Sequence, residues 1–285
     1  NPSWHPSGKY IVFQAVDPSL GLKAMTKTLL YKIYTSPGAG VQNNIWIMSS
    51  DGKRVWQMTR FRNKNEGVLH PHFSPDGTKL IWAQRINNEK GIGRWVMKLA
   101  SFTEKGDDIS VKEISTLTPG NMLFYETHGF SPDGKKIIFT GMPPKGLCAD
   151  FDIYTFDLDG GTLMCLTDPK LRQWDEHAHF TPDGKHIVWM SSMGNPQSPA
   201  RLNQIHVKTD FWIMNADGSG KKQISFFNDP PGTGSKKKEK KKRVIASDLC
   251  ISGNGRYLFG YIQDPGTVVR PGSVVRIPLP FDYMH

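Results

Sequence analysis

The chain has 285 residues, of which 38% are hydrophobic and 22% are charged. This balance, with 15 Phe, 8 Trp and 8 Tyr, is typical of a globular protein and excludes an intrinsically disordered one. No apolar run is long enough to span a membrane as a helix. The cysteines lie far apart and form no CxxC pair, which excludes a disulfide framework and a thiolate zinc site: Cys148, Cys165 and Cys250.

The formal net charge of +10 is concentrated in one segment. Residues 236–243 contain seven basic residues and one acidic residue. A nucleic-acid-binding protein would spread its charge over a face and interleave aromatic residues for base stacking, so we expect no nucleic-acid partner. The run is either a solvated loop or a contact for a protein partner with an acidic surface. Its candidate contact residues are Lys236, Lys237, Lys238, Lys240, Lys241, Lys242 and Arg243.

Two sequence phrases recur along the chain. The first phrase consists of an aromatic residue, then Ser or Thr, then Pro-Asp-Gly, and then an apolar run. It occurs at residues 73–82, 130–139 and 180–189, and degenerate copies occur at residues 4–13 and 251–259. The second is Asn or Asp, an aromatic residue among apolar ones and then Asp-Gly, at residues 44–52, 152–160 and 210–218. A short predicted strand follows each Asp-Gly and ends in Thr59, Thr167 or Ser225.

These phrases predict short antiparallel strands joined by tight turns. Gly accepts a positive φ and Asp caps its own turn, and the apolar runs between turns have the usual strand length. Each repeat therefore predicts four strands, named A to D in chain order, with strand A innermost. Units of this kind bury their apolar faces against one another, which predicts an all-β fold, a β-propeller of four-stranded antiparallel blades.

Five repeats are visible, and there would be six or more if an N-terminal segment were missing. We expect a single propeller domain over residues 1–285, with Phe73, Phe130 and Phe180 in equivalent buried positions. The expected repeat units are residues 1–60, 61–118, 119–168, 169–227 and 244–285, with a basic insertion loop at 228–243.

Over nearly the whole chain, these phrases resemble the repeat of TolB-like (PD40, WD40-like) β-propellers. The resemblance implies the fold more than a function, because such repeats occur in periplasmic scaffold proteins, in peptidase propeller domains and in some lyases. It favours a periplasmic or otherwise extracytoplasmic location. Most long connecting segments fall between strands B and C or between D and A, which places them on one face of the predicted propeller.

Histidines gather just before strand A. Among the nine histidines of the chain, five fall within the three residues that precede a strand A marker, namely His70, His72, His128, His177 and His179, and Asp248 holds the matching place in the last copy. Because side chains in a strand repeat every two residues, each His-x-His pair is expected to direct both rings to one side. We expect the five rings to converge at the mouth of the channel, either as a divalent transition-metal site or as a hydrogen-bonded polar ring.

Two functions remain open from the sequence. The chain contains no GxSxG elbow, P-loop, GxGxxG or HExxH motif, so no catalytic residue can be named. This absence favours a non-catalytic module that docks a protein partner or ligand through its loop-rich face in an extracytoplasmic complex. The alternative is a metal-dependent propeller enzyme. Oligogalacturonate lyases are propellers with a His-rich metal site, and His177-Ala178-His179 is similar to their His-x-His element.

Overall fold

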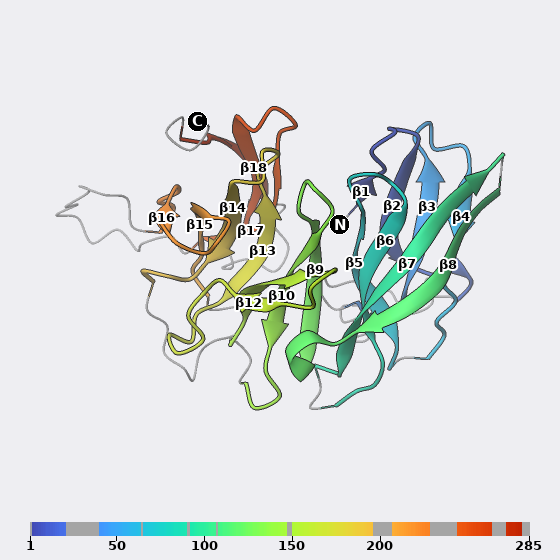
Figure 1. The fold of residues 1–285 in the computed structure, drawn as a ribbon, viewed down its shortest axis with the longest axis horizontal. Helices are drawn as coiled ribbons and strands as arrows, with labels where there is room; N and C mark the ends of the chain where they lie inside the picture. The colour runs from blue at the N-terminus through green and yellow to red at the C-terminus, as the bar shows by residue number, and fades with distance from the viewer. Residues whose placement is uncertain are drawn as a thin grey trace. The chain divides into compact units, whose positions relative to one another are not determined.

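The computed structural model describes residues 2–20, 40–63, 65–89, 92–106, 108–146, 150–195, 207–228, 244–263 and 272–280. In these residues the regular structure is almost entirely strand, with two single-turn 3-10 helices, Pro18–Leu20 and Pro119–Asn121 (Figure 1). None of the described helices is long or apolar enough to cross a membrane. The predicted all-β class is confirmed.

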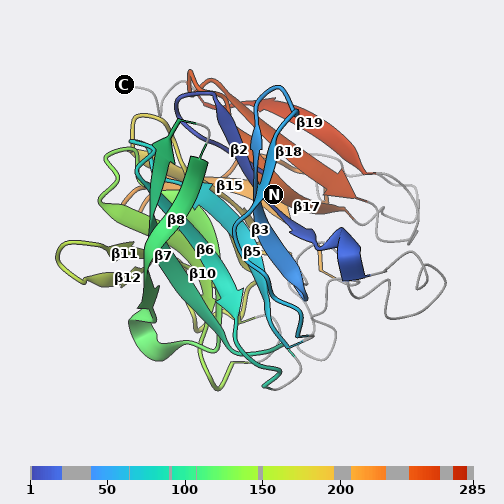
Figure 2. The same cartoon turned by 90° about the vertical axis from the view of Figure 1, so that its right-hand side faces the viewer.

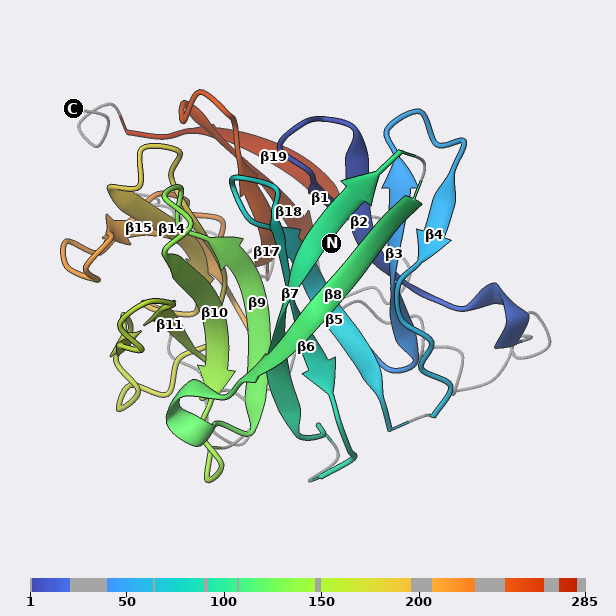
Figure 3. The same cartoon turned by 45° about the vertical axis from the view of Figure 1, so that its right-hand side comes forward.

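The chain divides into two compact units, Asn1–Ile137 and Ile138–His285. The first unit holds two complete sheets, each of four strands in chain order. The strands of the first sheet are β1 (Ser3–Trp4), β2 (Tyr10–Val16), β3 (Asn43–Ser49) and β4 (Val55–Gln57). Those of the second sheet are β5 (Gly67–Phe73), β6 (Lys79–Arg85), β7 (Trp95–Lys105) and β8 (Asp108–Leu117). The long hairpin of β7 and β8 is clear in Figure 3.

The third sheet contains the point at which the two units divide. Its strands are β9 (Phe124–Phe130), β10 (Lys136–Met142), β11 (Asp152–Asp157) and β12 (Leu163–Cys165). The second unit continues with a fourth sheet of β13 (Asp175–Phe180), β14 (His186–Ser191), β15 (Asp210–Asn215) and β16 (Lys222–Gln223). The last sheet contains β17 (Ile245–Ile251), β18 (Tyr257–Gln263) and β19 (Ser273–Pro278).

Each sheet corresponds to one sequence repeat and follows the chain as an antiparallel meander. The fifth sheet differs from the expectation, because its described residues form three strands instead of four. These three strands lie side by side in Figure 2. The division into one domain with five repeat units remains a prediction.

The Pro-Asp-Gly turns between the first two strands of a sheet share one hydrogen-bond pattern. In the second sheet the Ser74 hydroxyl donates to the Asp76 carboxylate, which accepts the Thr78 N–H. The Ser74 oxygen also accepts the Lys79 N–H. These bonds, led by that from Ser74, lower the pKa of Asp76 to about 2. Ser131 with Asp133, Thr181 with Asp183 and Ser252 with Asn254 repeat the pattern.

A second repeated contact joins the last two strands of three sheets. In the third sheet the Thr167 hydroxyl donates to the Asp152 carboxylate at 2.8 Å and accepts the Ile153 N–H at 3.0 Å. Thr59 makes the same pair of bonds with Asn44 and Ile45, and Ser225 makes it with Asp210 and Phe211. The hydroxyl residue that follows each short fourth strand therefore fastens that strand to the third.

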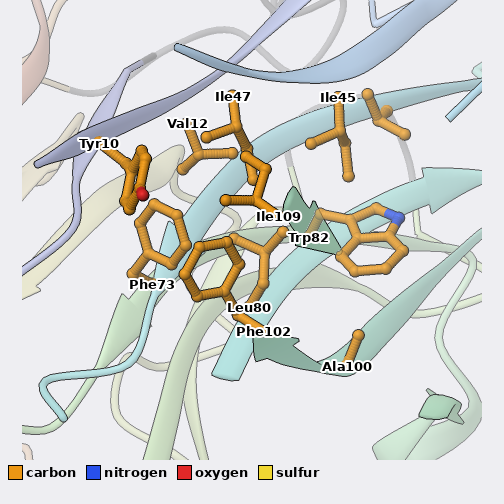
Figure 4. Close-up of a cluster of buried hydrophobic side chains, with 11 residues drawn as sticks. Tyr10, Val12, Ile45, Ile47, Phe73, Leu80, Trp82, Ala100, Phe102 and Ile109 are labelled. Carbon is orange, nitrogen blue, oxygen red and sulfur yellow. The ribbon is translucent and has the colours of Figure 1, made fainter. Parts of the chain in front are cut away.

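The core of the first unit lies between its first two sheets. Buried apolar side chains from both sheets meet there, and Figure 4 shows the cluster. Phe73 is buried under the rings of His5 and Phe102, whose centroids lie 4.8 and 5.1 Å away. Phe130 and Phe180 are only half-buried. The expected equivalence of the three rings is therefore wrong, because the cover over Phe73 includes the long strand β7, which is particular to its own sheet.

Candidate functional site

The first strands of three sheets carry an irregularity at the same sequence position. The antiparallel register shifts between Leu69 and His72 in β5, between Glu176 and His179 in β13, and between Ser247 and Leu249 in β17. At each shift one residue adopts a left-handed backbone conformation: His70 (φ 49°), His177 (φ 53°) and Asp248 (φ 27°). Such bulges redirect side chains, and a left-handed conformation in a residue other than Gly is a strained feature typical of functional sites.

In the first unit the bulge brings His70 to a buried acid and a second imidazole. His70 Nδ1 lies 3.1 Å from Glu126 Oε1, and both side chains are almost fully buried. The ring of His128 packs edge-on against that of His70, with centroids 5.6 Å apart, and is also buried. The ligand atoms of these three residues all lie within 4.8 Å of one another. We call His70, Glu126 and His128 the His-Glu-His cluster.

Two neighbouring strands hold the peptide groups of His70. Strand β5 lies beside β9, and β2 packs against β5 from the preceding sheet. The His70 N–H donates to Gln14 Oε1 at 2.5 Å, and the Thr127 hydroxyl donates to the His70 carbonyl oxygen at 2.7 Å. The strained bulge is therefore supported on both sides by side chains from other strands.

The bulge also separates the two members of the His70-Pro71-His72 pair. Because the register shifts between Leu69 and His72, the two-residue period on which the prediction rested is interrupted here. His72 is half-buried and lies over Gly129, where an added β-carbon would stand 3.7 Å from His72 Nδ1. Only His70 of this pair belongs to the His-Glu-His cluster.

In the second unit the corresponding residues have charged and aromatic partners within their own unit. His177 Nδ1 lies 3.7 Å from Asp248 Oδ1, across the neighbouring strands β13 and β17. Burial raises the pKa of Glu176, which accepts the Trp174 indole N–H at 2.5 Å. Burial, aided by His177, lowers the pKa of His179 to about 4, so this imidazole is neutral at ordinary pH. The convergence of all five histidines remains a prediction.

Sequence reasoning missed Glu126 as a potential ligand. A signal was available, because Glu126 and Glu176 both stand four residues before the strand A marker of their copies, Phe130 and Phe180. His128 joins His70 although it stands one residue out of register with the other histidines. The backbone next to His128 is distorted at Gly129, which has a φ of 113° that a residue with a side chain rarely adopts. The predicted contact residues Lys236 to Lys238, Lys240 to Lys242 and Arg243 lie outside the described residues.

The His-Glu-His cluster fits a divalent transition metal. Two imidazole nitrogens and one carboxylate oxygen form the donor set of many catalytic zinc and non-haem iron sites, in which three protein ligands leave coordination positions open. A buried carboxylate also needs a balancing positive charge, which either a metal ion or a protonated imidazole supplies. Burial of all three side chains limits competition from water for the same donors.

Comparison with known proteins shows the fold. No family model matches the chain. An uncharacterized protein of Agrobacterium fabrum is 26% identical over an alignment of 249 residues, which covers 73% of this chain and 76% of that protein. A TolB-like protein of Agrobacterium tumefaciens matches with a TM-score of 0.60 and 19% identity, over 98% of this chain and 76% of that one. TolB of Acinetobacter baumannii matches with a TM-score of 0.56 and 16% identity, over 98% of this chain and 54% of that one.

An enzyme shares the same fold. An oligogalacturonate lyase in complex with manganese matches with a TM-score of 0.52 and 13% identity, over 100% of this chain and 66% of that one. This chain thus spans about half of the Acinetobacter protein and about two thirds of the lyase. The comparisons confirm a β-propeller fold and a likeness to TolB-like propellers. They place proteins of different function on that fold, so the function must be argued from the site.

Proposed function

We propose that the protein binds a divalent transition metal through the His-Glu-His cluster and is a metal-dependent enzyme for a carboxylate-bearing ligand. The observation that carries this proposal is the buried grouping of two imidazoles and one carboxylate from β5 and β9. His70 precedes Glu126 by 56 residues and His128 by 58 residues, and it lies in a different sheet from both. A purely structural histidine needs one partner, whereas this cluster gathers three metal-type donors.

Each residue has a distinct part in such a site. His70 and His128 would each present one ring nitrogen. The carboxylate of Glu126 would supply a negative charge, which favours the binding of a dication. When bound, the ion would act as a Lewis acid on an oxygen of the ligand at an open position. The likeness to a manganese-bound oligogalacturonate lyase supports an acidic oligosaccharide as the first ligand to test.

The first prediction is that three ligand variants abolish metal binding. Calorimetric titration of the chelator-treated protein with MnCl₂ and ZnCl₂ should give one equivalent bound, and H70Q, E126Q and H128Q should each lose it. The matched controls are H5Q and E104Q, because His5 bonds to Ser7 and Gly77 and Glu104 pairs with Lys9 at the surface. Wild-type protein that binds no metal would overturn the proposal. Metal binding without cleavage of oligogalacturonate would remove this substrate and leave the metal site.

A second candidate function is a module that docks a protein partner in an extracytoplasmic complex. The observation that favours it is the likeness to two TolB-type propellers over 98% of the chain. The partner contact would be the basic run at residues 236–243, which fits an acidic protein surface. The two functions use different parts of the chain and can therefore be tested separately.

A further inference from the structure

The backbone N–H and C=O groups of His70 lie at the bulge and bond to side chains of other strands. In a β-bulge the extra residue drops out of the ladder, and its N–H and C=O groups must find other partners when they are buried. At His70 both partners are side chains, Gln14 from β2 and Thr127 from β9. Thr127 is completely buried, and its sequence distance from His70 is 57 residues.

We propose that Gln14 and Thr127 are positioning residues that set the affinity of the metal site by fixing the peptide of His70. The proposal rests on the proposed metal site, since the effect is measured on the metal. Neither side chain needs to touch the ion. Each acts through the backbone of His70, whose left-handed conformation determines where the imidazole points.

The physical reason is the cost of the His70 conformation. A left-handed residue other than Gly is held in place only when its surroundings over-determine it. Two hydrogen bonds from opposite sides do so here, one to the N–H and one to the C=O of the same residue. Without them the peptide can relax toward an ordinary extended conformation, and the ring of His70 then leaves Glu126. Loss of such orienting partners typically costs a metal site about 10- to 100-fold in affinity.

The His-Glu-His cluster and its two positioning residues together come from three strands. Strand β5 supplies His70, β9 supplies Glu126, His128 and Thr127, and β2 supplies Gln14. Thr127 stands between two of the proposed ligands in the sequence, so strand β9 would supply both metal ligands and a residue that orients His70. A role limited to filling space would need the methyl group of Thr127 and not its hydroxyl.

The test compares T127V, which keeps the shape and removes the hydroxyl, with T127S, which keeps the hydroxyl. The dissociation constants for Mn²⁺ and Co²⁺ are measured by titration, together with the visible absorption spectrum of the Co²⁺ protein and the urea stability of the metal-free protein. T127V should bind metal about tenfold or more weakly and show a changed Co²⁺ spectrum. T127S should stay within about threefold of wild type. Q14M, which removes the acceptor from a half-buried position, should weaken binding in the same way.

The matched control is T209V. Thr209 is also fully buried and donates to a strand carbonyl, that of Ala246, at 2.6 Å, yet it has no bond to His70. T209V should lower stability without changing metal affinity. Equal affinities for T127V, Q14M and wild type would overturn the positioning role and leave the metal site intact. If T127S weakens binding as much as T127V, the hydroxyl is not the cause and the role is overturned as well. Wild type that binds no metal would overturn the metal site itself.

Discussion

Two buried acidic residues in the first strands of their sheets differ in the groups that lie beside their carboxylates. Glu126 has the imidazole of His70 at 3.1 Å. Asp175 is completely buried and accepts the Trp189 indole N–H at 2.9 Å through Oδ1, while Oδ2 has no hydrogen-bond partner in the described part of the chain. Burial therefore raises the pKa of Asp175 from 3.8 to about 7. The carboxyl group of Glu126 therefore has a titratable imidazole beside it, whereas that of Asp175 has a neutral indole.

Asp175 gives a prediction for stability against pH. Its pKa is higher in the folded protein than in the unfolded chain, so the folded state binds the proton more tightly. The stability that this proton contributes is present at low pH and is lost as pH rises from about 4 to about 7. In urea unfolding across this range, D175N should remove that fall in the free energy of unfolding, while its amide oxygen still accepts the Trp189 N–H.

The control for this experiment is D76N. Hydrogen bonds lower the pKa of Asp76 to about 2, so its contribution is lost only as pH falls below the ordinary carboxyl range. D76N should leave the slope between pH 4 and 7 unchanged. An identical slope for D175N and wild type would show that Asp175 is ionised throughout the range.

At the scale of elements, the short fourth strands depend on single hydroxyl groups. Strand β12 is three residues long, too short to be held by its ladder alone. Thr167, just beyond it, bonds both to the Asp152 carboxylate and to the Ile153 N–H in the neighbouring strand β11. Asp152 and Thr167 are both buried, and this burial raises the pKa of Asp152 to about 6.

T167V should therefore destabilise the protein by about 2 kcal/mol, because it leaves a buried N–H and a buried carboxyl without their partner. T167S, which restores the hydroxyl, should recover most of this loss. T103V is the matched control: the Thr103 hydroxyl bonds to that of Ser110 in an exposed position, and its loss should stay within about 0.5 kcal/mol. The measurement is chemical unfolding at pH 7. Equal losses for T167V and T103V would contradict the role of this joint.

At the scale of the whole molecule, the charge distribution separates the two candidate functions. Most of the net charge of +10 lies in residues 236–243, whereas the His-Glu-His cluster lies in the first unit. Replacing Lys236 to Lys238 and Lys240 to Lys242 by Gln should leave the free energy of unfolding within about 0.5 kcal/mol of wild type. It should leave metal binding unchanged.

Binding of an acidic protein partner should respond differently to the same replacement. Wild-type affinity should fall steeply between low and physiological salt, because exposed charges are screened. The Gln variant should bind more weakly at low salt and lose most of this salt dependence. A salt series that is the same for both proteins would remove the basic run from the interface. As a control for the change in net charge, six exposed lysines elsewhere on the surface are replaced by Gln.

The sequence alone was sufficient to predict the repeat, the all-β class and the propeller fold. Turn chemistry at Ser74-Pro75-Asp76-Gly77 and strand alternation depend on neighbours within a few residues, so they can be recognised without the fold. The position of His70, His177 and Asp248 in their repeats could also be predicted, because the repeat itself marks the start of each first strand. In the structure this position is the bulge.

Only the tertiary structure decided which of these residues belong together. The bulge interrupts the two-residue period, so His70 enters the His-Glu-His cluster and His72 does not. Glu126 and Thr127 meet His70 across 56 and 57 residues of chain, and Gln14 does so across 56. Contacts over such distances arise when separate sheets pack, and no local rule of turn or strand specifies them. The chemistry of the site is therefore a property of the packed blades, while the blades themselves are a property of the repeat.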